Sequence, residues 1–123
     1  MIELVSDLGG GKTTFVRGLA RGIGSDDTVS SPTFTLSNVY KGQKLTMHHF
    51  DFYRLAEPGI MREELAEVLT DPEAVTIIEW ADIVHDVLPD ERLTIHITTT
   101  GETSRHYDLS VSDALQYLTE GLA

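Results

Sequence analysis

Gly9-Gly10-Gly11-Lys12-Thr13-Thr14 is the stretch that decides the fold of this chain. It follows the short apolar run 2–5 and precedes residues 13–23, in which apolar side chains recur at helical spacing. This order predicts a strand, a glycine loop and a helix. Glycines let the backbone curl around a phosphate with its amide hydrogens pointing inward, and the helix N-terminus adds a partial positive charge. The stretch therefore predicts a phosphate-binding loop.

The full P-loop pattern is a glycine, four free positions and then Gly-Lys-Ser/Thr. Ser6 occupies the first position here, and a residue this small still fits the tight turn. In this pattern Lys12 places its charge at the β- and γ-phosphates, and Thr13 places its hydroxyl on Mg²⁺. The alternative is a flexible glycine hairpin with an incidental lysine. The predicted strand and helix on either side argue against that alternative.

The composition is typical of one soluble globular domain. The chain has 123 residues, 41% hydrophobic and 24% charged, which is enough for one core and too little for two ordinary domains. It has no membrane-length apolar run and no signal-peptide layout, so we expect a cytoplasmic protein with no membrane contact. The absence of cysteine excludes disulfides and thiolate zinc sites. The formal net charge of −11 disfavours autonomous nucleic-acid binding, so a nucleotide must be captured by local donors and a metal ion.

The rest of the chain predicts two antiparallel hairpins, one further strand and several helical segments. The hairpin strands are expected at 34–40 with 45–52, and at 93–99 with 107–111. A buried strand is expected at 74–78, because the residues there are apolar or β-branched. Helical segments are expected at 61–69, 83–88 and 112–122, the last of them capped by Ser112.

Two acidic residues follow predicted strands. A P-loop enzyme needs a carboxylate at the end of a neighbouring strand, where it holds the metal directly or through water. Asp51 is the first candidate, because it ends an apolar-rich strand, and Glu79 is the second. If both strands run parallel to the first strand, the two carboxylates meet at the same edge of the sheet. The alternative for each is a solvated acid at a strand terminus.

Four side chains near these acids allow more than one interpretation. His48 and His49 are adjacent, so on a strand they point to opposite faces and do not easily share one metal; structural roles are favoured for both. Trp80 either packs in the core or stacks on a base or a partner. Arg54 either faces a phosphate, pairs with an acid or forms a surface salt bridge.

Four motifs in order carry a resemblance to a known family. They are Leu8-Gly9-Gly10-Gly11-Lys12-Thr13-Thr14-Phe15, Ser31-Pro32-Thr33-Phe34-Thr35-Leu36, His49-Phe50-Asp51-Phe52-Tyr53-Arg54 and Ile78-Glu79-Trp80. Together they resemble the TsaE (YjeE) family, the bacterial ATPases of tRNA threonylcarbamoyladenosine biosynthesis. The similarity runs from Ile2 to Arg105. It implies an α/β, P-loop NTPase-like three-layer fold with a mixed central sheet, formed by a single domain over residues 1–123.

The resemblance also implies a function. Members of the family bind ATP and Mg²⁺ and hydrolyse ATP slowly, in a manner that depends on the partner proteins TsaD and TsaB. This turnover resets the threonylcarbamoyl transferase between rounds of tRNA modification, so tRNA is involved only indirectly. The alternative is a non-catalytic, nucleotide-dependent interaction module. A small-molecule kinase would need a lid with arginines, and only four arginines follow the first helix.

Site residues follow from the same resemblance by matching positions. It implies that Asp51, Glu79 and Lys12 are catalytic, with Asp51 orienting the attacking water, and that Thr13 and Glu79 bind Mg²⁺. The Ser31-Pro32-Thr33 segment resembles a switch loop near the γ-phosphate, and Trp80 begins a second switch. The residues implied to bind ATP are Leu8, Gly9, Gly10, Gly11, Lys12, Thr13, Thr14 and Arg105.

The chain departs from the family at its N-terminus. Family members usually carry a further segment before the first strand, and this segment helps to cover the adenine. Here the chain begins almost at that strand. We therefore expect a domain that is short at the N-terminus, through a misassigned start or a truncation, with weakened recognition of the base.

Overall fold

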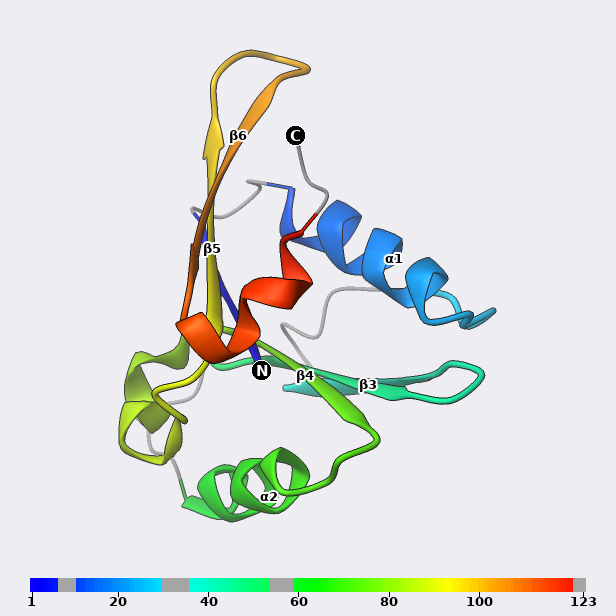
Figure 1. Ribbon diagram of the computed structural model, residues 1–123, viewed down its shortest axis with the longest axis vertical. Coiled ribbons are helices and arrows are strands. Elements are labelled where there is room, and N and C mark those ends of the chain that lie inside the picture. The colour runs from blue at the N-terminus through cyan, green and yellow to red at the C-terminus, as the bar shows by residue number, and fades with distance from the viewer. Residues whose placement is uncertain (7–10, 30–35, 54–58, 121–123) are drawn as a thin grey trace.

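A mixed sheet forms the centre of the computed structural model, which describes residues 1–6, 11–29, 36–53 and 59–120 (Figure 1). Within those ranges the sheet has six strands in the order β2-β3-β4-β1-β5-β6. The four inner strands β3, β4, β1 and β5 are parallel, and the edge strands β2 and β6 are antiparallel to their neighbours. The strands are β1 (Ile2–Val5), β2 (Ser37–Lys41), β3 (Thr46–Asp51), β4 (Ala74–Glu79), β5 (Leu93–Thr99) and β6 (Arg105–Val111).

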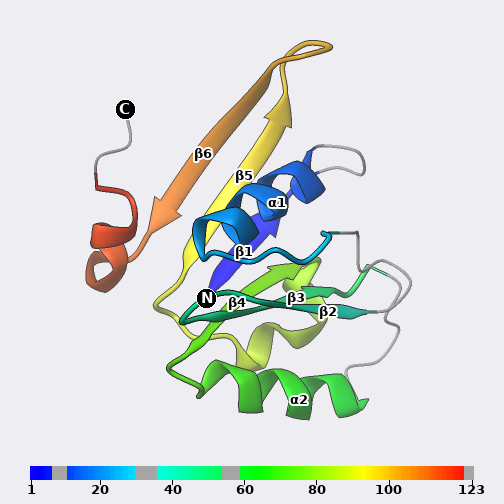
Figure 2. The same ribbon diagram turned by 90° about the vertical axis from the view of Figure 1, so that its right-hand side faces the viewer.

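Helices cover both faces of this sheet (Figure 2). On one face, α1 (Lys12–Gly22) buries Val16 and Ala20 against side chains of the inner strands, among them Ile77. On the other face, α2 (Gly59–Leu69) and the 3₁₀ helix η1 (Ala81–Val87) pack in a second apolar cluster. A further 3₁₀ helix, η2 (Asp113–Leu118), follows β6. The expected three-layer α/β arrangement with a mixed sheet is therefore confirmed.

The carboxyl ends of three parallel strands meet at one edge of the sheet. In the register of β1 with β4, Leu4 lies opposite Glu79, and in the register of β3 with β4, Asp51 lies opposite the same glutamate. The chain leaves β1 at this edge and enters α1 after Gly11. Ligands of open α/β sheets bind outside the carboxyl ends of the strands. This topology confirms that the two predicted acids lie on neighbouring parallel strands.

Two details of the predicted elements are wrong. The first strand of the first hairpin does not extend back through Leu36, because that residue has a φ of 68° in the left-handed region, and β2 begins at Ser37. The closing helix is a short 3₁₀ segment without a side-chain cap, although Ser112 precedes it. The backbone carbonyl of Ser112 accepts from the amide of Leu115 at 2.9 Å, so the backbone closes the first turn.

None of the helices in the described part of the chain is long and apolar enough to span a bilayer.

Candidate functional site

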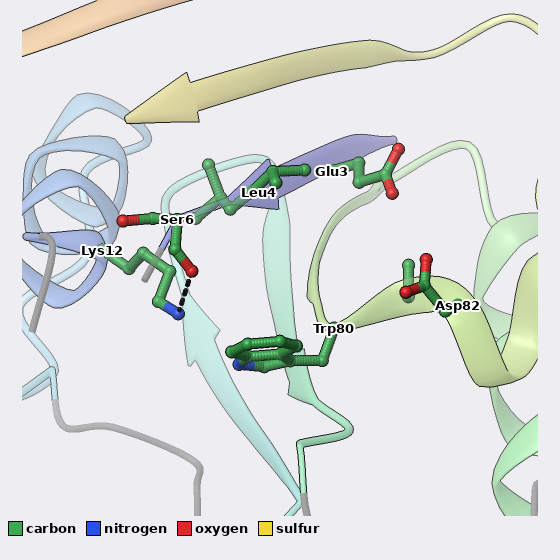
Figure 3. A pocket seen from close by; sticks show the side chains of 8 residues that line it. Glu3, Leu4, Ser6, Lys12, Trp80 and Asp82 are labelled. Carbon is green, nitrogen blue, oxygen red and sulfur yellow. Dashed lines mark hydrogen bonds between the residues drawn. The ribbon is translucent and has the colours of Figure 1, made fainter. Parts of the chain in front are cut away.

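Lys12 lies where α1 meets the sheet. Gly11 precedes it with a φ of 95°, a left-handed conformation that a residue with a Cβ adopts only at a cost. The lysine is buried, with 8% of its surface exposed. Its Nζ donates to the backbone oxygen of Ser6 at 3.4 Å (Figure 3) and lies 3.2 Å from Oε1 of Glu79. The left-handed backbone of Gly11 and the start of α1 therefore direct the ammonium group to the ends of β1 and β4.

Glu79 is the last residue of β4 and is buried, with 3% of its surface exposed. Each of its carboxylate oxygens has a partner: Lys12 Nζ at Oε1, and His49 Nε2 at Oε2 at a distance of 2.5 Å. An ionised carboxylate only accepts hydrogen bonds, so the Nε2–H of His49 is the donor. Lys12, Glu79 and His49 thus form a continuous buried chain of polar contacts from α1 to β3.

The environment of Glu79 favours its charged form. Burial by itself raises the pKa of this carboxyl group, because it removes water from the anion. The hydrogen bond and charge of His49, followed by the charge of Lys12, outweigh burial and hold the pKa of Glu79 below its ordinary value of 4.5. Glu79 is therefore an anion at neutral pH, which is the form that a divalent cation requires.

Asp51 ends β3 and is buried at the same sheet edge. Its Oδ1 accepts from the backbone amide of Tyr53 at 3.0 Å, which fixes the direction of the carboxylate where the chain leaves the strand. The amide of Phe52 donates to the carbonyl of Glu79 at 3.1 Å, so the two strand ends remain joined beyond Asp51. The structure therefore brings both predicted acids to one place.

Trp80 lies next to Lys12 and does not pack in the core. Its ring centroid is 5.2 Å from Lys12 Nζ and 4.9 Å from the ring of Tyr53, and 37% of its surface is exposed. Its backbone has φ 56° and ψ 53°, a left-handed conformation that costs a bulky residue about 1–3 kcal/mol. Such strain is concentrated at functional sites. The ring therefore does not pack in the core, and stacking on a base or a partner stays a prediction.

Arg105 reaches the start of α1 from the first position of β6. A Cβ on Gly11 would lie 3.6 Å from Nε of Arg105, so the guanidinium lies beside the glycine turn. Nη1 donates to the carbonyls of Gly101 at 3.2 Å and Ser104 at 2.8 Å, which holds the side chain in place. Gly11, Thr14 and Arg105 line a cavity of about 170 Å³. A residue far away in sequence is thus placed next to the predicted phosphate loop.

The remaining predicted site residues divide into two groups. Thr13 is half-buried in the first turn of α1, and Thr14 beside it is exposed. Both lie at the same end of the helix as Lys12. The other group lies outside the described residues, so its predictions remain untested: Leu8, Gly9, Gly10, the switch segment Ser31-Pro32-Thr33, and Arg54.

Sequence reasoning missed the contact between His49 and Glu79. It favoured a purely structural role for both histidines, although alternation along a strand places His49 on the same face as Asp51. The structure gives His49 a fully buried position, whereas His48 is half-buried on the opposite face. The signal that could have found His49 is therefore its spacing of two residues from the predicted acidic site residue.

Two cavities lie near opposite ends of α1. A cavity of about 100 Å³ borders Lys12, Ser6 and Trp80, well below the volume of about 300–1,000 Å³ typical of ligand pockets (Figure 3). A larger cavity, about 430 Å³, lies around Arg17 and Arg21 toward the other end of the helix. Of these two cavities, the smaller one borders Lys12 of the site described above.

The described residues contain no cluster of three or more His, Cys, Asp or Glu side chains that could hold a metal ion by itself. Oxygens that could hold a cation at this edge are those of Glu79 and the hydroxyl of Thr13, with water or a bound phosphate supplying the rest. This mixed oxygen set suits Mg²⁺, which usually keeps several waters and binds one or two carboxylates together with phosphates.

The strand order, the helix that follows the first strand and the lysine at its first position define a class of protein. The chain is an α/β protein with a P-loop NTPase-like fold. A family model described as "Threonylcarbamoyl adenosine biosynthesis protein TsaE" matches residues 1–107. The chain therefore belongs to the TsaE family, and the resemblance of the four motifs is confirmed.

Individual relatives agree with this assignment. The chain is 35% identical over 125 residues to the tRNA threonylcarbamoyladenosine biosynthesis protein TsaE of Bacillus subtilis strain 168, covering 100% of this chain and 77% of that protein. It is 38% identical over 105 residues to the protein of that name from Treponema pallidum, covering 85% and 77%. A crystal structure of Bacillus subtilis YdiB superposes with a TM-score of 0.76 at 34% identity, covering 97% of this chain and 73% of that one.

Proposed function

We propose that the chain is a magnesium-dependent ATPase of tRNA threonylcarbamoyladenosine biosynthesis. In this proposal it hydrolyses ATP slowly by itself and faster with TsaD and TsaB, and the turnover resets the partner transferase. It would act in the cytoplasm and reach tRNA only through these partners. The names of its relatives support the pathway, because they are called tRNA threonylcarbamoyladenosine biosynthesis proteins.

One observation carries the ATPase part of the proposal. Lys12, at the first position of a helix that follows a glycine turn, lies 3.2 Å from the carboxylate of Glu79 at the end of a parallel strand. A triphosphate with its metal needs this combination of a cation, a helix N-terminus and an adjacent anion. Lys12 would neutralise phosphate oxygens, and Glu79 with Thr13 would hold Mg²⁺. When bound, the metal would neutralise charge on the phosphate oxygens.

Other residues have separate parts in the proposal. Asp51 would orient the attacking water, because its carboxylate is buried at the same edge and its direction is fixed by the amide of Tyr53. Arg105 would add a second cation beside the glycine turn, since its Nε lies 3.6 Å from the position of a Cβ on Gly11. Gly11 would bring its backbone close to the phosphates, together with Leu8, Gly9, Gly10 and Thr14.

ATP turnover by the purified chain with excess Mg²⁺, with and without TsaD and TsaB, tests this function. We expect slow turnover alone and clear stimulation by the two partners. Lys12→Ala should lower the stimulated rate by about 10²-fold or more, because it removes a preorganised charge from the phosphates. Lys44→Ala is the matched control, since Lys44 is an exposed lysine in the turn between β2 and β3.

Two results would count against the proposal. Equal turnover in wild type and Lys12→Ala would contradict ATP hydrolysis at the proposed site. An absence of stimulation by TsaD and TsaB would contradict the proposed dependence on these partners. The non-catalytic interaction module makes a different prediction. If Asp51→Ala still supports full tRNA modification in a reconstituted reaction, nucleotide binding suffices and hydrolysis is incidental.

A further inference from the structure

His49 is fully buried, and among the described residues only one of its two ring nitrogens has a hydrogen-bond partner. Its Nε2 donates to Oε2 of Glu79 at 2.5 Å, while its Nδ1 is buried without a partner among the described residues. A buried polar atom without a partner destabilises the folded state, because it has lost its hydrogen bonds to water. An apolar side chain of similar size would fill the same space without that cost. The single contact with Glu79 is therefore the feature that distinguishes His49 from a packing residue.

The contact crosses the sheet diagonally. His49 lies opposite Ile77 in the register of β3 with β4, and Asp51 lies opposite Glu79. The imidazole therefore does not lie beside Ile77 alone. It reaches along β4 to the carboxylate of Glu79, two residues beyond Ile77. Both ends of the contact belong to central parallel strands, and each side chain is buried. Such a donor has little freedom to move, so it defines the orientation of the carboxylate.

The two oxygens of Glu79 are consequently divided between two sides of the site. Oε2 points to β3 and is held by His49, whereas Oε1 points to α1 and meets Lys12 at 3.2 Å. A carboxylate that could rotate freely would offer either oxygen. Here only Oε1 lies on the side where the P-loop lysine and the first turn of α1 are placed.

We propose that His49 is a positioning residue that holds Oε2 of Glu79 against β3 and thereby presents Oε1 to a divalent cation at the start of α1. The inference rests on the proposed function, because it takes Glu79 to be a magnesium ligand. Partners of this kind, which hydrogen-bond to a metal-binding carboxylate, usually change metal affinity by about 10–100-fold when they are removed.

The test separates binding of the metal from binding of the nucleotide. A non-hydrolysable ATP analogue is titrated into the protein by calorimetry, first in EDTA and then at increasing Mg²⁺ concentrations. The titrations give the Mg²⁺ concentration at which the affinity for the analogue is halfway between its value in EDTA and its value at saturating Mg²⁺. We expect His49→Met to raise that concentration about tenfold or more, with unchanged affinity in EDTA. His49→Gln, whose amide nitrogen can occupy the place of Nε2, should restore most of the loss. His48→Met is the matched control and should resemble wild type.

Each other outcome has a definite meaning. If His49→Met shows the same Mg²⁺ dependence as wild type, the inference is overturned. It is also overturned if His49→Met loses affinity for the ATP analogue equally with and without Mg²⁺, because that result indicates a structural role. If wild type itself gains no affinity from Mg²⁺, the proposed function fails first and the inference with it. If His49→Met does not fold, His49→Asn replaces it with the same expectation, because its amide lies nearer to Cα and falls short of Glu79.

Discussion

Glu79 is a buried anion whose stability depends on two neighbours. Removing a carboxylate from water costs several kcal/mol unless good hydrogen bonds and opposite charges compensate. Lys12 and His49 provide this compensation, one at each oxygen. The same arrangement keeps the ammonium of Lys12 in place between the carboxylate, the carbonyl of Ser6 and the ring of Trp80. The groups proposed to bind phosphate and metal therefore stabilise one another before any ligand arrives.

Replacing Glu79 by glutamine should destabilise the fold near neutral pH. The change leaves the ammonium of Lys12 buried without its anion, which costs about 3 kcal/mol, the low end for a broken buried ion pair. We choose the low end because Lys12 keeps the Ser6 carbonyl and the Trp80 ring. Because the folded-state pKa of Glu79 is lowered, its contribution is fully present above the ordinary value of 4.5 and is lost as pH falls through the folded-state pKa.

Urea unfolding of both proteins, from about pH 7 down to about pH 4 and below, measures this difference as a function of pH. The gap in the free energy of unfolding between wild type and Glu79→Gln should narrow at the acidic end. Both proteins lose stability there for other reasons, so only their difference is informative. A gap that stays constant, or widens as pH falls, would contradict a lowered pKa for Glu79.

At the level of elements, local patterns predict the phosphate loop because all of its parts are neighbours in sequence. The strand, the glycines and the helix over residues 2–23 follow from apolar spacing and residue type alone. The meeting of Asp51 with Glu79 could also be predicted, since parallel strands place their ends together. The contact of His49 with Glu79 depends on strand register, which one sequence does not reveal.

The placement of Arg105 and the end of the chain illustrate two further limits. Family resemblance indicates Arg105 whereas no local pattern does, because its approach to Gly11 requires β6 to lie at the edge of the sheet beside β5. Ser112 was predicted to cap a helix, yet its backbone closes the turn and its Oγ is buried without a partner among the described residues. Capping residues are identified by type, whereas the hydrogen bond depends on rotamer and packing.

Helix α1 should become more stable when its exposed glycines are replaced by alanine. Gly18 and Gly22 are four residues apart, and a Cβ on either would meet no atom within 4 Å apart from its chain neighbours and the backbone of the helix itself. Glycine inside a helix costs about 0.5–1 kcal/mol relative to alanine, because the unfolded chain is more flexible. We expect Gly18→Ala to gain this amount and Gly22→Ala less, since the last turn of a helix frays. Urea unfolding at equilibrium measures both.

Gly24→Ala is the contrasting substitution for this prediction. Gly24 has a φ of 81°, and a Cβ there would lie 2.9 Å from the side chain of Gln43, so alanine should destabilise the protein. Together the three variants separate helix propensity from backbone strain. If Gly18→Ala lowers stability as Gly24→Ala does, α1 is not the regular exposed helix that the structure presents.

For the molecule as a whole, acidic residues are distributed unevenly along the chain. Between residues 8 and 50 the only acids are Asp26 and Asp27. By contrast, α2 and the turn after it carry a series of exposed acids: Glu63, Glu64, Glu67, Asp71 and Glu73. A net charge of −11 destabilises the compact state through self-repulsion, and this local group of acids adds to it.

Reversing one charge on α2 should therefore stabilise the protein most at low salt. Glu67→Lys places a cation three and four residues after Glu64 and Glu63, and near the negative C-terminal end of the helix, for a gain of about 0.5–1 kcal/mol. Raising ionic strength from about 0.01 to about 0.1 M shortens the Debye length from about 30 to about 10 Å, so wild type should gain stability and the advantage of the variant should shrink. Thermal unfolding of both proteins across this range measures the effect.

The stability of Glu67→Gln should lie between that of wild type and that of Glu67→Lys. A gain in stability that does not depend on salt would indicate that helix propensity, not repulsion, is responsible.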